Sequence, residues 1–104
     1  MSSEYTLIFG LGPKNDGTPN SDVDIAIALA ALEDAALTEC GGFTMHRGKG
    51  GWIDPAGKTF KEEVAILMVS GSFSSIEAIA GVGKRQLGKT AIYVKKPDGS
   101  TILL

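Results

Sequence analysis

The sequence predicts a single α+β domain with the split β-α-β order of ferredoxin-like folds, covering residues 1–104. Its 104 residues, 43% hydrophobic and 21% charged, are enough for one small domain with a core of its own. The hydrophobic patterns run strand, helix, strand, strand, helix, strand (βαββαβ), and a short C-terminal strand follows. The first and third strands of that topology lie in the centre, and they are the two most apolar strands here.

The first half of the chain predicts a strand, a loop and a long helix. Residues 5–9 are β-branched, aromatic or aliphatic and end at a glycine-rich loop over residues 10–20. Ser21 can cap a helix, and the two aspartates of its first turn are favoured by the helix dipole. Gly41 stands where a helix of this spacing should end.

The middle of the chain predicts two strands of different character. Residues 43–47 alternate between apolar and polar, which is typical of a strand with one face on the core. Glycines between Gly48 and Gly51 are expected to break that strand, and residues 54–57 suit a turn. The next strand, residues 60–69, becomes continuously apolar and should therefore be central.

The last third predicts a second helix and two strands. One of three serines can cap the helix, which should end at Gly88. The candidate caps are Ser72, Ser74 and Ser75. Residues 90–95 predict a strand, residues 97–99 a turn, and residues 101–104 a short terminal strand.

Self-association is expected because two helices cover one face of such a sheet, whereas the third strand is apolar on both faces. A second copy of the chain is the simplest cover for the other face. The sequence therefore predicts a homodimer whose sheets pack face to face.

The net charge of −2 argues against a general nucleic-acid binder. Its distribution is uneven, since residues 1–45 carry one base and seven acids, and residues 46–104 carry nine bases and five acids. These halves can complement each other within the chain, complement each other between copies, or frame a site for an anion. Ordinary solvated surface charge is the alternative interpretation.

Several segments together resemble a small bacterial and phage family of unknown function. The shared features are a Tyr-x-Leu-x-Phe-Gly opening, a Gly-x-Thr step, a Gly-x-Trp-x-Asp-Pro-x-Gly centre, a following Glu and a basic helix end. They correspond to residues 5–10, 42–44, 51–58, 62–64 and 84–88. The resemblance implies a single ferredoxin-like domain and brings no established reaction.

His46 is a candidate general base or acid. If its strand neighbours Phe43 and Met45 face the helices, alternation places His46 on the open face of the sheet. Glu62 or Glu63 of the neighbouring strand can then orient it. The alternative is a polar residue at the rim of an interface.

The glycine-rich segment 46–52 is a candidate ligand-binding site. Flexible backbone amides, the cations Arg47 and Lys49, and the indole of Trp52 can hold an anion beside a stacked ring, with His46 close by. A flexible hairpin loop is the alternative for the segment, and a structural plug is the alternative for Trp52.

Metal and cofactor binding are not expected, because one histidine and one cysteine, Cys40, give no adjacent pair of ligands. A single cysteine also fits a reducing compartment. No secretory signal or membrane-spanning stretch is predicted, and the expected location is the cytoplasm, or the host cytoplasm for a phage-encoded chain.

The leading functional hypothesis is a non-enzymatic homodimeric module that binds a small anionic ligand or a partner protein. A phage protein that inhibits or sequesters a component of host defence is a special case of it. The alternative is a small cofactor-independent enzyme that resembles dimeric α+β barrel isomerases and monooxygenases and uses His46. An assembly subunit is a third hypothesis.

Overall fold

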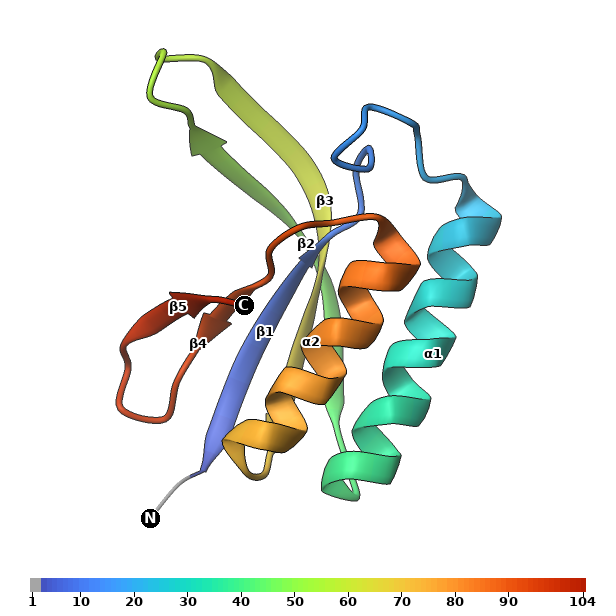
Figure 1. Cartoon of the computed structure of the whole chain (residues 1–104), viewed down its shortest axis with the longest axis vertical. Helices are drawn as coiled ribbons and strands as arrows, with labels where there is room; N and C mark the ends of the chain where they lie inside the picture. The colour runs from blue at the N-terminus through green and yellow to red at the C-terminus, as the bar shows by residue number, and fades with distance from the viewer. Residues whose placement is uncertain (1–2) are drawn as a thin grey trace.

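The computed structural model describes residues 3–104 and has two helices and five strands in that part of the chain (Figure 1). In chain order they are β1 (Glu4–Gly10), α1 (Asp22–Cys40), β2 (Thr44–Ile53), β3 (Thr59–Ser70), α2 (Phe73–Leu87), β4 (Tyr93–Lys95) and β5 (Thr101–Leu103). The predicted order of elements, including the short last strand, is confirmed.

The five strands form one antiparallel sheet in the order β2-β3-β1-β4-β5. The first and third strands of the chain therefore lie inside the sheet, as their apolar sequences predict. The α+β class and the ferredoxin-like split β-α-β order are both confirmed by this topology.

Both helices lie on one face of the sheet and begin and end where the sequence signals them (Figure 1). Ser21 caps α1 in a capping box with Asp24, and Ser72 is the serine that caps α2. Gly41 and Gly88 end the two helices with φ angles of 78° and 63°, a left-handed conformation that glycine adopts without strain.

The core lies between the helices and the sheet. Its largest fully buried side chains come from both helices, from three strands and from the segment before β4. They are Phe9, Leu7, Leu32, Leu67, Ile76, Ile79, Leu87, Ile92 and Val94. Burial of each such side chain stabilises the fold by about 1.5–3 kcal/mol, so this one face accounts for most of the hydrophobic driving force.

Two boundaries differ from the sequence prediction. β2 does not break at Gly48 but continues through the glycines to Ile53, because β3 supplies a cross-strand partner for every one of its residues. β4 begins at Tyr93 and not at Thr90, because Ile92 pairs with Leu104 outside the assigned strands and Thr90 binds the Asn15 side chain.

The longer β2 has a consequence for the shape of the molecule. Beyond the body of the sheet, β2 and β3 run on together as a two-stranded hairpin that projects away from both helices (Figure 1). We call its outer part, residues 51–61, the arm. The described accessible surface of 6000 Å² exceeds the roughly 5500 Å² expected for a compact monomer of this mass, as a projecting arm requires.

Candidate functional site

The face of the sheet away from the helices carries a row of mainly apolar side chains. Strand register aligns one residue from each strand across all five strands, in the order His46, Ile66, Ile8, Tyr93, Leu103. Their strand neighbours alternate to the helix side, where all but the exposed Arg47 lie in the core or pack against it. Tyr93 and Leu103 are 43% and 70% exposed, so this row is a surface and not a second core.

His46 lies on this open face, as the alternation of its strand predicts. Met45 and Phe43 pack against the core on the helix side, whereas His46 is exposed and stands opposite Ile66. Its immediate cross-strand neighbour is therefore aliphatic. The structure supplies no carboxylate at the position where an orienting group is expected.

Glu62 occupies a different place, at the end of the sheet where β1 finishes. One carboxylate oxygen accepts a hydrogen bond from the Gly12 amide at 3.0 Å and pairs with Lys89 Nζ at 3.4 Å. Both side chains of the ion pair are only 13% exposed. We call the cluster formed by Glu62, Lys89, Gly10 and Gly12 the carboxylate seat.

Two glycines make room for this carboxylate. A Cβ atom on Gly10 would lie 2.1 Å from Glu62 Oε1, and one on Gly12 would lie 2.4 Å from Oε2. Real Cβ atoms do not approach oxygen so closely, so any other residue at either position would displace the side chain. The Glu62 side chain thus explains why glycines occupy positions 10 and 12 at the end of β1.

Neither predicted glutamate reaches His46 within one chain. Glu62 stands opposite Gly50, and His46 stands opposite Ile66, four residues further along β3, which is a separation of roughly 13 Å. Glu63 points to the other face, where it stands opposite Lys49. The structure does not assemble the catalytic pair that the sequence suggested.

The loop after β1 is tied to the end of α2, which holds the carboxylate seat in position. Lys89 Nζ donates to the Pro13 carbonyl at 2.7 Å in addition to its pairing with Glu62. The Asn20 amide donates to the carbonyls of Gly12 at 2.9 Å and Leu87 at 3.0 Å. These bonds join segments 8 to 76 residues apart and fix the loop over residues 11–20 against the helix layer.

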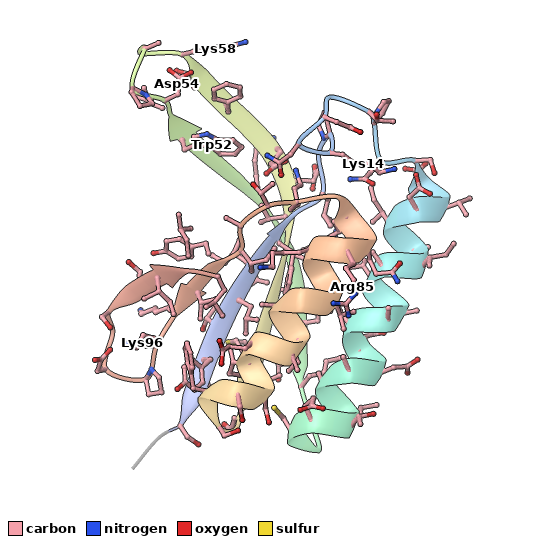
Figure 2. The ribbon with its side chains drawn as sticks, viewed as in Figure 1. Lys14, Trp52, Asp54, Lys58, Arg85 and Lys96 are labelled. Atoms are coloured by element: carbon pink, nitrogen blue, oxygen red, sulfur yellow. The ribbon has the colours of Figure 1, made fainter. Side chains whose placement is uncertain are left out.

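The arm presents an aromatic pair. The rings of Trp52 and Phe60 stack with centroids 5.2 Å apart and planes 11° from parallel, and Lys58 Nζ lies 5.1 Å from the Phe60 centroid. Trp52 remains 49% exposed (Figure 2). The tip is closed by a turn in which the Lys58 amide donates to Asp54 Oδ1 at 2.8 Å.

The four predicted ligand-binding residues divide between two faces. His46 and Trp52 belong to the open face, whereas Arg47 and Lys49 alternate to the opposite face of the same strand. The glycines between them are paired in β2 and form no loop that could wrap an anion. The predicted strand break at these glycines is wrong, because strand pairing overrides the flexibility of the segment, and ligand binding by the four residues stays a prediction.

Lys89 and Phe60 belong to the site, although the sequence argument passed over both. Phe60 could have been found from alternation, since it shares the parity of Glu62 and stands opposite Trp52. Lys89 carried no local signal, because the crossing of the segment after α2 over the end of β1 brings it to Glu62.

Residues 3–104 contain no group of three or more His, Cys, Asp or Glu side chains placed to hold a metal ion. Burial, followed by the charge of Glu39, raises the pKa of the Cys40 thiol and keeps it protonated at neutral pH. Cys40 lines a shallow hollow of about 310 Å³ with Gly41, Phe43 and Met68, at the end of the sheet away from the arm. Within the same part of the chain, no helix is long and apolar enough to cross a membrane.

A second hollow, of about 360 Å³, lies between β1 and the turn that joins β4 to β5. Its lining includes Thr6, Lys95, Lys96 and Asp98. Neither hollow is lined by His46 or by Glu62.

No protein-family model and no curated protein sequence matches this chain. Solved structures do match over nearly the whole length. A phage SAM lyase in complex with S-methyl-5'-thioadenosine superposes with a TM-score of 0.69 at 10% identity, covering 99% of this chain and 88% of the lyase.

Two further structures are similar. The periplasmic divalent cation tolerance protein CutA from Archaeoglobus fulgidus gives a TM-score of 0.55 at 11% identity and covers 98% of this chain and 82% of its own. A Bacillus cereus protein related to NIF3 gives 0.52 at 12% identity, covering 100% of this chain and 26% of its own. At such identities the likenesses show a shared fold, and that fold is the ferredoxin-like α+β domain predicted from the sequence.

Proposed function

We propose that this chain is a small-molecule-binding module that works as a homo-oligomer and holds its ligand at the carboxylate seat. The observation that carries the proposal is the placement of Glu62, a carboxylate 13% exposed that is fixed by an amide and a lysine above two glycines. Its other oxygen, Oε1, lies over Gly10. Such a preorganised anionic group is more than a core of this kind needs for stability.

The geometry favours a ligand that combines a flat ring with a cationic or hydrogen-bond-donating group. The Trp52–Phe60 pair offers a stacking surface on the face of the sheet that carries Glu62. Arg47 and Lys49, the cations that suggested an anionic ligand, point to the opposite face. A nucleoside-type ligand with a positive centre therefore fits the described residues better than an anion does.

A second candidate is an enzyme that cleaves S-adenosylmethionine, and the structural likeness to the phage SAM lyase favours it. S-adenosylmethionine carries a sulfonium cation and an adenine ring, so it has both features named above. Glu62 would then stabilise or attract positive charge in the reacting molecule. This assignment replaces His46 as the centre of the chemistry, because His46 has an aliphatic cross-strand neighbour.

Self-association completes the proposal. The open face leaves Tyr93 and Leu103 exposed, and packing of two sheets face to face would cover them and enclose the seat. Sequestration of a small molecule by a phage-encoded chain is one way in which host defence could be inhibited. The alternative is that the module binds a partner protein in place of the small molecule.

Calorimetric titration with three adenosine derivatives tests the proposal. S-adenosylmethionine is a cation at sulfur, S-methyl-5'-thioadenosine is neutral, and adenosine monophosphate is an anion. We expect the first to bind most tightly and the third least. Glu62→Gln should weaken binding of the first by 10- to 150-fold, since a hydrogen bond to a charged group contributes about 1.5–3 kcal/mol.

Glu63→Gln is the matched control, because it removes the same charge from the neighbouring residue on the opposite face. It should leave binding within about twofold of the parent value, as expected for exposed surface charge. Chromatography of the S-adenosylmethionine mixture separates the two candidates, since loss of that compound over time shows cleavage. Equal binding by the parent and both variants, or no binding of any nucleoside, would contradict the proposal.

A further inference from the structure

The aromatic pair of the arm lacks a surface to pack against within its own chain. Trp52 is 49% exposed and Ile53 on the other side of the arm is 69% exposed, and in Figure 2 the Trp52 side chain lies far from both helices. Monomeric proteins seldom leave an indole and its stacking partner projecting into water without a function. The arm therefore has the character of an interaction surface.

The open face of the sheet also has apolar side chains that nothing in residues 3–104 covers. The row across the strands exposes Tyr93 by 43% and Leu103 by 70%, whereas Ile66 and Ile8, which lie between His46 and Tyr93, are half-buried. The arm cannot fold back to cover this row. Phe60 and Ile66 are six residues apart on the same strand, which places them roughly 20 Å from each other along a continuous ladder.

The surface between the arm and the row contains glycines on which side chains of β3 pack. Gly48, Gly50 and Gly10 share the open-face parity of their strands, and they lie between the aromatic pair and the apolar row. A Cβ on Gly50 would lie 3.0 Å from the Val64 side chain, and one on Gly10 would overlap the Glu62 carboxylate. Val64 and Glu62 therefore cover these glycines, and Trp52, Tyr93 and Leu103 are the exposed large hydrophobic residues of this face.

We propose that the arm of one copy packs its Trp52–Phe60 pair onto the apolar row of a second copy. The arm of each copy then covers the apolar row of the other, which is the reciprocal pairing of a two-fold symmetric interface. The proposal rests on the self-association contained in the proposed function and names the residues that carry it. It also brings an aromatic side chain of one copy to the face that bears His46 of the other.

The area available is sufficient for a stable interface. Three strands roughly 20 Å long and two strands of three residues, roughly 10 Å long, lie about 4.8 Å apart and give an open face of about 400 Å², to which the arm adds roughly 200 Å². The total of about 600 Å² per copy, or about 1200 Å² for two copies, reaches the lower end of the range for specific interfaces.

Trp52 is the single tryptophan of the chain, so its fluorescence reports directly on the arm. We expect its emission to shift to longer wavelength and its quenching by acrylamide to rise when the protein is diluted. Both changes should coincide with dissociation measured by sedimentation velocity. Leu103→Asp, a change in the exposed part of the row, should raise the concentration at half-dissociation by at least tenfold.

Ile27→Asp is the matched control, because Ile27 is 55% exposed on the outer side of α1, away from the row. It should leave both curves unchanged, and circular dichroism should show that both variants are folded. An oligomer whose Trp52 emission is insensitive to dilution would overturn the proposal, as would a monomer at every concentration. Disruption by Ile27→Asp with no effect of Leu103→Asp would assign the interface to α1. No nucleoside is present, so the outcome is independent of whether the chain binds one.

Discussion

Gly10→Ala is expected to destabilise the protein through Glu62 and not through the backbone of β1. Gly10 has no positive φ angle, so alanine is compatible with the local conformation. The new methyl group would overlap Glu62 Oε1, 2.1 Å away, and would move the carboxylate off its bond to the Gly12 amide. The cost should therefore depend on whether residue 62 is a glutamate.

The magnitude follows from the bonds that would be lost. The hydrogen bond from the Gly12 amide to the charged Glu62 carboxylate contributes about 1.5–3 kcal/mol to the free energy of unfolding, and the partly exposed ion pair with Lys89 adds about 0–1 kcal/mol. Replacement of glycine by alanine recovers about 0.4–1 kcal/mol by restricting the unfolded chain. We expect a net loss of about 1–2 kcal/mol for Gly10→Ala alone.

A double-mutant cycle measures the coupling. In a Glu62→Ala background, Gly10→Ala should be neutral or stabilising by up to about 1 kcal/mol, which gives a coupling of about 1.5–3 kcal/mol. Urea unfolding followed by circular dichroism, at one fixed protein concentration, gives all four free energies. An equal cost in both backgrounds would refute the assignment of the glycine to the carboxylate seat.

Three further predictions concern the helices and the thiol. Gly83→Ala should lower the free energy of unfolding in urea by about 0–2 kcal/mol, because its Cβ would lie 2.2 Å from the buried Phe9 ring. Gly81→Ala should raise it by up to about 1 kcal/mol, because its Cβ would meet only the flexible Arg85 side chain at 3.3 Å. Equal effects of the two substitutions would contradict this packing. Ser21→Ala should cost about 1 kcal/mol in urea unfolding through the loss of its capping hydroxyl. The hydrogen bond from the Ser21 backbone amide, which this variant retains, is the main cause that holds the pKa of Asp24 below its ordinary value of 3.8. The stability from that carboxylate is present above pH 3.8 and is lost as the pH falls through the lower folded pKa, so acid unfolding should show this loss in the parent and in Ser21→Ala but not in Asp24→Asn. Alkylation of Cys40 at pH 8 should be slower than that of a free cysteine, because burial raises the thiol pKa, and a rate equal to that of glutathione would disprove it.

The fold was predictable because its signals are local and agree with one another. Ser21 and Gly41 bound α1 as capping chemistry requires, and the continuous apolar run of β3 places that strand inside the sheet. The face of His46 followed from simple alternation. Each of these inferences needs only a residue and its near neighbours in sequence.

The site was less predictable because its contacts are long-range. Glu62 was a candidate in the sequence, but its partners Gly12 and Lys89 lie 50 and 27 residues away and meet it through sheet register and a crossing segment. The glycines of β2 misled the prediction for a related reason. Their low intrinsic preference for strands is a local property, and pairing with β3 overrides it.

Those glycines are explained by close packing against β3. A glycine inside a strand destabilises it by roughly 0.5–1 kcal/mol relative to alanine, and β2 contains three within four residues, Gly48, Gly50 and Gly51. In a domain of marginal stability such a cost is kept only where a side chain would obstruct something. At Gly10 and Gly12 the obstructed group is Glu62, within the same chain. In β2 the obstructed groups also belong to the same chain, because a Cβ on Gly50 would lie 3.0 Å from the Val64 side chain and one on Gly51 would lie 3.2 Å from the Phe60 carbonyl oxygen.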